Sequence, residues 1–313
     1  MLSSSFRTFT DPDECAAAQH NSTNETVIAR SGVYTATHVR IAFQSVQMQR
    51  LSESLARTTH VTPSGTRAAL TFQTKPGPST IRNGVELGLG SFQRTHPAHT
   101  YFEQSRGAAS IGSLSLSPEE WAQIAPTLLG YDLTPLNDHQ AMTPDPAAMT
   151  RLLRLHGAAG TLAQDAPAVL AHPEAARGLE QALIEAMVNC AGGEVREDRM
   201  AGRQHAAIMR RFYRTIEQSG DQPLYILEVC KEIGASERTL RACCHEYLGM
   251  GPKHFLLLRR LNMVRRALQR AAPSEITVTE IATHYGFWQF GRLAGEYQAM
   301  FGETPSATLA RPV

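Results

Sequence analysis

Two brief interruptions of helical patterning, at Gly234 and Gly286, constrain this chain more than any other feature. In "LYILEVCKEIGASERTLRACCHEYLGMGP" (224–252), helical apolar spacing stops at Gly234 and resumes after Ser236. Glycine ends a helix readily because it adopts positive φ, and a serine hydroxyl can cap the helix that follows. Two short helices joined by a tight turn form a helix-turn-helix motif, whose second helix can enter a DNA major groove.

The stretch "ITVTEIATHYGFWQFGRLAGEYQAMFGETPSATL" repeats this arrangement around Gly286. We expect a first helix that ends near Tyr285, Phe287 as a plug at the junction, and a second helix over 288–300. The chain therefore contains two helix-turn-helix motifs. The apolar residues expected to face inward in the first helix of the first motif are Leu224, Leu227, Val229 and Cys230.

Between the motifs lies "GPKHFLLLRRLNMVRRALQRAAP", which predicts a continuous linker helix over 252–271. Its expected apolar face is Leu257, Leu261, Val264 and Leu268, and five arginines occupy much of the remainder. A helix of about 20 residues spans about 30 Å, close to the roughly 34 Å of one DNA turn. Two reading helices at its ends could therefore enter successive major grooves on one side of a duplex.

These stretches resemble the DNA-binding domain of the AraC/XylS family of transcription regulators. The resemblance rests on "RTL", "LG-x-GP-x-x-F", "RL-x-x-x-RR-x-L", "IA-x-x-YGF" and "FGETPS", all at the family's spacing between Leu224 and Thr308. It implies an all-α DNA-binding domain over 208–313. The first motif would lie at about 224–248 and the second at about 278–301.

The family's groove-facing positions in the first motif fall on Arg238, Arg241 and Ala242. Either arginine could read a guanine, and Glu237 could accept a hydrogen bond from a cytosine amine. The alternative is that both arginines touch only phosphates, as most protein–DNA contacts do. The expected DNA-contacting residues of this motif are Ser236, Glu237, Arg238, Thr239, Arg241, Ala242 and His245.

In the second motif the matching positions fall on Phe290, Gly291 and Gly295, where many family members carry polar residues. The glycines have no side chain to bond a base, whereas Phe290 could touch a thymine methyl group. We expect this motif to read less sequence than the first, and Trp288 to be a partly buried packing residue. The expected DNA-contacting residues here are Gln289, Phe290, Gly291 and Arg292.

The preceding chain favours an α+β fold with a distinct N-terminal domain over 1–190. Residues 26–116 contain short alternating runs separated by Gly, Pro, Asn or Ser, which indicate a small, cupin-like β-barrel or a sandwich. Ser117, Pro118 and Glu120 form a helix-start signal, and helical spacing continues over 118–190. The polar, glycine-containing stretch 191–207 is interpreted as a linker before the all-α domain.

Gly90, His96, His99 and Glu103 approximate the metal motif of cupins. The spacing between the histidines differs by one residue, Pro97 interrupts the strand, and no second histidine half follows. We therefore expect no metal ligand, no catalytic residue and no cofactor, and we interpret Tyr101 and Phe102 as ordinary strand residues.

Charge and cysteine content constrain the function less. The net charge is +1, but residues 208–313 contain 14 Lys and Arg against 10 Asp and Glu, which suits a nucleic-acid partner. The five cysteines have no metal-binding spacing. The N-terminus has no signal-peptide pattern, and no apolar run approaches 18 residues, so a cytoplasmic protein without a membrane partner is expected.

The resemblance implies a non-enzymatic transcription regulator, an activator rather than a repressor, that contacts RNA polymerase. Its N-terminal domain would sense a small-molecule effector, form a homodimer, or both. The helical hairpin over 152–191 could be the dimer surface or core packed on the β region. Two alternatives remain open: a metal-dependent cupin-type enzyme fused to a DNA-binding module, and a regulator without any effector.

Overall fold

The structure is a computed structural model. It describes residues 3–95, 97, 99–131, 133, 141–192, 194–195 and 200–311. The chain divides into two compact units, which are described separately. The N-terminal unit comprises Met1–Thr26, Tyr34–Ser54 and Thr59–Asp198, and the C-terminal unit comprises Val27–Val33, Leu55–Thr58 and Arg199–Val313.

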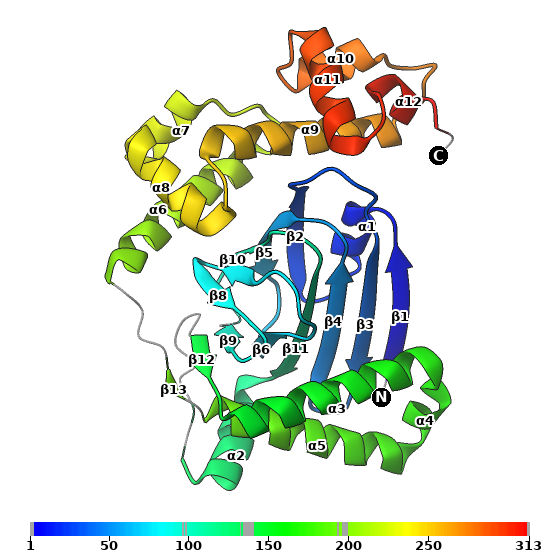
Figure 1. Cartoon of the computed structure of the whole chain (residues 1–313), viewed down its shortest axis with the longest axis vertical. Coiled ribbons are helices and arrows are strands. Elements are labelled where there is room, and N and C mark those ends of the chain that lie inside the picture. Colours follow the sequence, from blue (N-terminus) through cyan, green and yellow to red (C-terminus); the bar gives the residue numbers. More distant parts are fainter. Residues whose placement is uncertain are drawn as a thin grey trace. The chain divides into compact units, whose positions relative to one another are not determined.

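Two antiparallel sheets make up the β region (Figure 1). The eight-stranded sheet has the order β1-β3-β4-β11-β6-β9-β12-β13, and the five-stranded sheet has the order β2-β5-β10-β7-β8. Both sheets are open among the described strands, so the region is a sandwich and not a closed barrel. The strands are β1 (Ser3–Phe9), β2 (Ser22–Ile28), β3 (Ala36–Ala42), β4 (Gln47–Glu53), β5 (Arg57–Pro63), β6 (Ala68–Gln73), β7 (Thr80–Arg82), β8 (Val85–Leu87), β9 (Phe92–Thr95), β10 (Tyr101–Ser105), β11 (Ala109–Leu116), β12 (Ala141–Thr143) and β13 (Glu194–Val195).

The β region begins earlier than the sequence indicates. Strand β1 and the short helix α1 (Pro12–Ala17) precede the expected span of 26–116, and β1 pairs with β3 along its whole length. The side chains of β1 are mostly exposed, so the strand lacks the apolar alternation that would identify it. It is an edge strand stabilised by backbone pairing, and such strands give a weak sequence signal.

Helices cover one face of the eight-stranded sheet. They are α2 (Pro118–Leu129), α3 (Pro146–Asp165), α4 (Pro167–Ala171) and α5 (Pro173–Ala191). Helix α2 begins as predicted, with a capping box between Ser117 and Glu120. Helix α3 packs against β1, β3 and α5 (Figure 1). Between this helical layer and the sheet lies an apolar core that includes Phe72, Phe92 and Trp121.

The hairpin formed by α3 and α5 contributes its apolar residues to this core. Leu152, Leu183 and Met187 are fully buried there, and the outer face of α3 carries Arg151 and Arg154. Glu180 of α5 is also buried, and its Oε1 accepts hydrogen bonds from Ser45 N at 2.6 Å and Val46 N at 3.1 Å. The apolar residues thus serve as core, and a dimer surface on this hairpin stays a prediction.

A buried histidine fixes α3 on the sheet. Nε2 of His156 lies 3.0 Å from the carbonyl oxygen of Gln49, and its ring meets Phe72 edge-on at 5.1 Å between centroids. A Cβ at Gly112 of β11 would lie only 2.7 Å from the His156 ring. Glycine at this position therefore lets the helix approach the strand. Burial lowers the pKa of His156 to about 4.

The low pKa of His156 predicts acid sensitivity of the N-terminal unit. The unfolded chain, with a histidine pKa near 6.5, binds a proton that the folded site rejects, so stability is lost as the pH falls from about 6.5 to about 4. Replacing His156 with glutamine keeps a donor for the Gln49 carbonyl and removes the titration. Between pH 7 and 4.5 the wild-type protein should lose about 2 kcal/mol more than this variant.

The measurement is denaturant unfolding followed by the fluorescence of Trp121, in a Trp288→Phe background that leaves Trp121 as the one tryptophan. Both proteins share Arg50, the charged group near His156, and the other buried histidines His38 and His60, so the contributions of these groups cancel in the comparison. An equal loss of stability in the two proteins between pH 7 and 4.5 would show that burial does not lower the pKa of His156.

The C-terminal unit contains seven helices in its described residues. They are α6 (Met200–Ser219), α7 (Ile226–Ile233), α8 (Glu237–Leu248), α9 (Pro252–Arg270), α10 (Val278–His284), α11 (Phe290–Phe301) and α12 (Pro305–Leu309). Residues 200–207, within the stretch interpreted as a linker, form the first turns of α6. Residues 193 and 196–199 of that stretch lie outside the described residues.

Helix α9 is buried on more sides than its sequence pattern indicates. Arg259 is buried, and its Nη2 donates to the carbonyl oxygen of Gly220 at 3.0 Å. The guanidinium of Arg260 stacks over the ring of Phe287 at 5.0 Å, and that of Arg265 over Phe301 at 4.7 Å. Arg260 and Arg265 therefore join α9 to the second motif. A partly desolvated cation over an aromatic ring contributes more to stability than an exposed one.

Candidate nucleic-acid interface

The first helix-turn-helix motif consists of α7 and α8. Gly234 ends α7 with φ +62°, and the Ser236 hydroxyl caps α8 by accepting from Thr239 N at 3.1 Å. Leu240 and Cys244 are buried, as predicted for the inner face of α8. One prediction is wrong: the side chain of Leu227 is 77% exposed. The α7 face that packs inward is instead centred on its two buried residues, Val229 and Ile233.

The outer face of α8 presents the predicted polar residues to solvent. Arg238 is exposed and forms no ion pair within the described parts of the chain. Arg241 Nη2 lies 2.9 Å from Glu237 Oε1, and Lys253 Nζ of α9 lies 2.9 Å from the same oxygen. These cations, Lys253 first, lower the pKa of the Glu237 carboxyl. Ala242 and His245 are also exposed, whereas the hydroxyl of Thr239 is bonded to that of Ser236 at 2.8 Å.

The second motif consists of α10 and α11. Thr277 and Glu280 form a capping box at the start of α10. Gly286 has φ +74°, and a Cβ there would lie 3.0 Å from Pro223 Cβ and 3.2 Å from the Tyr225 hydroxyl. Phe287 is 8% exposed, in agreement with its predicted role as a plug. The turn of the second motif therefore contacts the residues that lead into the first motif.

Helix α11 begins at Phe290, two residues later than predicted, and Trp288 precedes it in the turn. Trp288 is 78% exposed, so the expectation of a partly buried packing residue is wrong. Phe290 is 41% exposed, Gln289 and Gly291 are exposed, and Arg292 Nε bonds Glu296 Oε1 at 2.8 Å. The opposite face of α11 is buried through Leu293 and Tyr297. The four residues of the second motif that were expected to contact DNA thus lie together at the exposed start of the helix.

Basic residues are concentrated between the motifs rather than within them. Helix α9 contains six Lys and Arg residues and no acidic one. Each motif instead has one more acidic than basic residue, with four Glu against three Lys and Arg over 224–248 and two Glu against one Arg over 278–301. Electrostatic attraction to phosphates would thus come mainly from basic residues outside the two motifs, whereas contacts to bases would come from the exposed faces of α8 and α11.

The cupin-like motif does not form a metal site in the described residues, where no group of three His, Cys, Asp or Glu side chains could hold an ion. His96 lies outside the described residues. Glu103 is buried in an ion pair with Arg82. Tyr101 and Phe102 lie in β10, which confirms their interpretation as strand residues.

A buried polar layer, which was not predicted from the sequence, lies between the two sheets. Phe72 and Phe92 point into the helical core, so by alternation Gln73, Gln93 and Thr95 point toward the five-stranded sheet. From that sheet Arg82 reaches Thr95 Oγ1 at 3.1 Å. All these polar residues are at most 7% exposed. The polar residues that alternate in "TFQT", "TIR" and "FQRT" were the available signal, and the polar residues Thr80 and Arg82 of β7 and both sides of β9 are buried.

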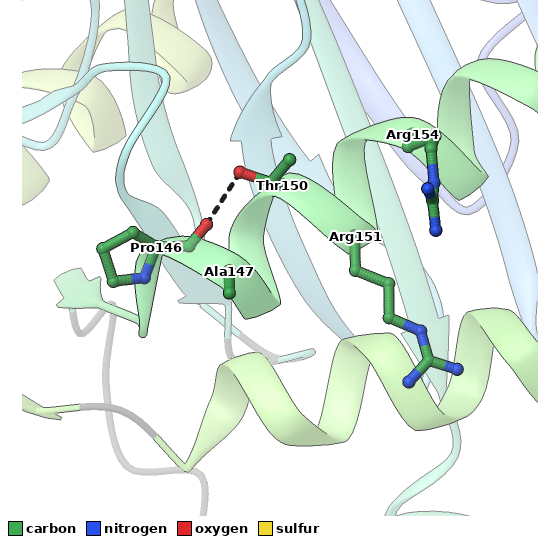
Figure 2. A pocket seen from close by; sticks show the side chains of 5 residues that line it. All are labelled: Pro146, Ala147, Thr150, Arg151 and Arg154. Carbon is green, nitrogen blue, oxygen red and sulfur yellow. Dashed lines mark hydrogen bonds between the residues drawn. The ribbon is translucent and has the colours of Figure 1, made fainter.

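A surface hollow lies on the outer face of α3 (Figure 2). The Thr150 hydroxyl there donates to the Pro146 carbonyl at 2.8 Å, and Arg151 pairs with Glu185 of α5 at 3.0 Å. The hollow is formed by one exposed helix face and contains no buried polar group, so it offers little enclosure to a small molecule. Its lining residues are Pro146, Ala147, Thr150, Arg151 and Arg154.

Among the described residues, no helix has the length and apolar character needed to cross a membrane.

Comparison with known proteins gives a family match within the C-terminal unit. A family model described as a helix-turn-helix domain matches residues 229–311.

Relatives of known description match mainly over part of their length. The chain is 34% identical over 148 residues to the "Probable thc operon regulatory protein" of Rhodococcus erythropolis, covering 46% of this chain and 44% of the relative. It is 33% identical over 101 residues to "XylDLEGF operon transcriptional activator 3" of Pseudomonas putida, covering 32% of this chain and 30% of the relative. The chain thus spans less than half the length of each. The solved structure of the AraC-like transcriptional activator CuxR matches with TM-score 0.44 at 15% identity, over 82% of this chain and 94% of that chain.

Proposed function

Because residues 229–311 form a helix-turn-helix domain of the AraC/XylS family, we propose that this protein is a sequence-specific DNA-binding transcription regulator. The observation that carries the proposal is the pair of exposed helix faces, on α8 and α11, at the two ends of one linker helix. Each is the second helix of its motif, the element that enters the major groove in such motifs.

The length of α9 supports binding of both motifs to one face of a duplex. Its 19 residues correspond to about 28 Å of helix, slightly less than one DNA turn. Because α8 and α11 differ in sequence, the two grooves would be read differently and the site would be asymmetric. Arg238 and Arg241 supply guanine-reading groups to the first groove, and double-stranded DNA is the partner.

We place a small-molecule effector at the polar layer between the sheets. Buried polar groups cost free energy unless they are partnered. Thr80 and Ser105 face each other across β7 and β10, and neither hydroxyl has a hydrogen-bond partner within the described residues. A small hydroxylated or carboxylated molecule could bond them. The test is a thermal-shift screen of such compounds, with Thr80→Val as the variant that should lose any shift.

Three further roles belong to the same proposal. The regulator would act as an activator, as the name of the Pseudomonas relative states for that protein, and would do so by recruiting RNA polymerase. It would work in the cytoplasm, where it meets DNA. A homodimer through the outer face of the α3–α5 hairpin is testable by sedimentation, with Arg154→Glu as the disrupting change.

An enzymatic N-terminal domain is the second candidate, since cupin-type folds include metal-dependent enzymes. The ion pair of Glu103 with Arg82 argues against its use as a metal ligand, so we propose a regulator without enzymatic activity. Metal analysis of the purified protein separates the two candidates. Stoichiometric iron, manganese, nickel or zinc would favour the enzyme.

Arg241→Ala is expected to weaken specific DNA binding by about 1–3 kcal/mol and to relax the preference at one base pair. The fold should survive, because Glu237 keeps its ion pair with Lys253. Selection of bound duplexes from a random library, followed by titration of the best site, measures both effects. Arg210→Ala removes an equal charge from the exposed surface of α6 and should leave the selected motif intact. An unchanged motif with Arg241→Ala would mean that this arginine contacts phosphate only.

A further inference from the structure

We infer that the second motif reads thymine methyl groups through Trp288 and Phe290, in place of the hydrogen-bond readout available to the first motif. This inference rests on the proposed function and adds a specificity mechanism for its second half-site. It begins from the most exposed large aromatic side chain of the C-terminal unit's described residues, Trp288 at 78%.

The position of the two aromatic residues points to DNA as their occupant. Trp288 lies two residues before α11, Gln289 is the N-cap of that helix, and Phe290 is its first residue. Residues at the start of the second helix of a helix-turn-helix motif are those that approach base edges. The aromatic surface is thus continuous with the DNA-binding face rather than with the buried side of the helix, which Leu293 and Tyr297 occupy.

Few polar side chains beside Trp288 and Phe290 could form hydrogen bonds with base edges. Arg292 is bonded to Glu296, and Gln289 is the remaining uncharged polar side chain in this turn. Gly291 and Gly295 lie one helical turn apart on the exposed surface, and a Cβ at either would meet nothing within 4 Å. Because the two glycines have no side chains, the preceding aromatic side chains of Trp288 and Phe290 are the prominent features of the helix start.

An exposed indole is costly in the free protein and is stabilised when it is covered by an apolar group. The apolar group in the major groove is the C5-methyl of thymine, because the other bases present only polar edges there. A face with few free hydrogen-bonding groups and two aromatic rings therefore matches a thymine-containing half-site better than a guanine-containing one.

Deoxyuridine substitution tests the inference directly, since uracil differs from thymine only by the missing methyl group. The wild-type full-length chain is first used to select a binding site from random duplexes. The half-site of the second motif is the one whose preference Arg241→Ala leaves intact. Replacing thymines by deoxyuridine in that half-site should weaken wild-type binding about fourfold for each contacted methyl group, the worth of one buried methyl group.

Trp288→Ala and Phe290→Ala should weaken binding to the thymine site and remove most of the difference between thymine and uracil. Gly295→Ala is the fold control, because alanine has open space there and a higher helix propensity, so its thermal midpoint should be unchanged or raised. Equal wild-type affinity for the thymine and uracil sites would overturn the inference.

Two other outcomes separate this inference from the proposed function. Trp288→Ala that binds DNA normally but fails to activate transcription would overturn the inference and assign Trp288 to a protein partner. Failure of the wild-type chain to select any motif would contradict the proposed function itself. Selection of a motif in which only the Arg241-dependent half is specified would leave that function intact and overturn the methyl readout.

Discussion

Replacing Gly286 with valine is expected to abolish specific DNA binding and to destabilise the second motif by about 3 kcal/mol or more. Gly286 has φ +74°, in the left-handed region that a β-branched residue adopts only at a cost of roughly 1–2 kcal/mol or more. The new Cβ would also lie 3.0 and 3.1 Å from Pro223 Cβ and Cγ. The proline ring is rigid, so the turn itself must shift.

The consequence should extend beyond the turn. Phe287, the next residue, is buried beneath Arg260 of α9, and Pro223 and Tyr225 lead into α7. Displacing Gly286 therefore disturbs the place where the two motifs meet the linker helix. Hydrogen exchange should show faster exchange throughout α10 and α11, with a smaller effect on α8.

Gly302 provides a matched control that isolates the strain of the left-handed backbone conformation. It also has φ +74°, but a Cβ there would meet nothing within 4 Å. Gly302→Ala should cost about 1 kcal/mol, the strain of the left-handed conformation alone, and Gly286→Ala should cost clearly more. Equal losses for the two alanine variants would show that contact with Pro223 and Tyr225 contributes nothing.

The positions of the turns and caps were predictable because each depends on a few neighbouring residues. Gly234 and Gly286 adopt positive φ, and the Ser236 and Ser117 caps form, because these are local backbone requirements. The faces of α8 were also predictable, since its apolar residues recur at helical spacing and leave Arg238 exposed.

Residues whose environment is set by distant packing were not predictable in this way. Trp288 is apolar and adjacent to the buried Phe287, yet it is exposed because α11 starts two residues later than periodicity suggests. Arg260 and Arg265 look like a solvated charged face, yet they cover aromatic rings of the second motif. A helical period locates a face but does not reveal which side chains from other helices will cover it.

The same limit applies to the β region. Strand β5 contains Arg57 and His60, which favour solvent and give no apolar alternation, although its first five residues are buried. Polar residues that alternate with apolar ones normally mark a solvated sheet face. Here the polar residues lie between two sheets. Only the arrangement of the strands shows that both faces of the eight-stranded sheet are covered.

That buried polar layer leads to the second large effect: Arg82→Met should destabilise the N-terminal unit by about 3–5 kcal/mol. The side chains of Arg82 and Glu103 are 3% and 8% exposed, and they form an ion pair. Arg82 also donates to Thr95 and stacks over the ring of Tyr101 at 4.3 Å. Its loss would leave the Glu103 carboxylate buried without its compensating charge.

Denaturant unfolding followed by Trp121 fluorescence, in the Trp288→Phe background, measures this loss in the unit concerned. The double variant Arg82→Met with Glu103→Leu should recover most of the stability, because an apolar pair of similar volume avoids the buried charge. A single variant as stable as the parent protein would show that water reaches Glu103 once Arg82 is removed.

The double variant also separates a structural role of the ion pair from a role in effector binding. If Arg82 and Glu103 serve only the fold, a protein that regains stability should regain every ligand-induced thermal shift as well. If they belong to the effector site, the stable double variant should bind operator DNA normally and give no shift with an effector that shifts the parent protein. Because α8 and α11 lie in the other compact unit, DNA binding is the appropriate internal control. Retained stability with a lost shift is the combination that only a binding role produces, since a folding defect would lower both.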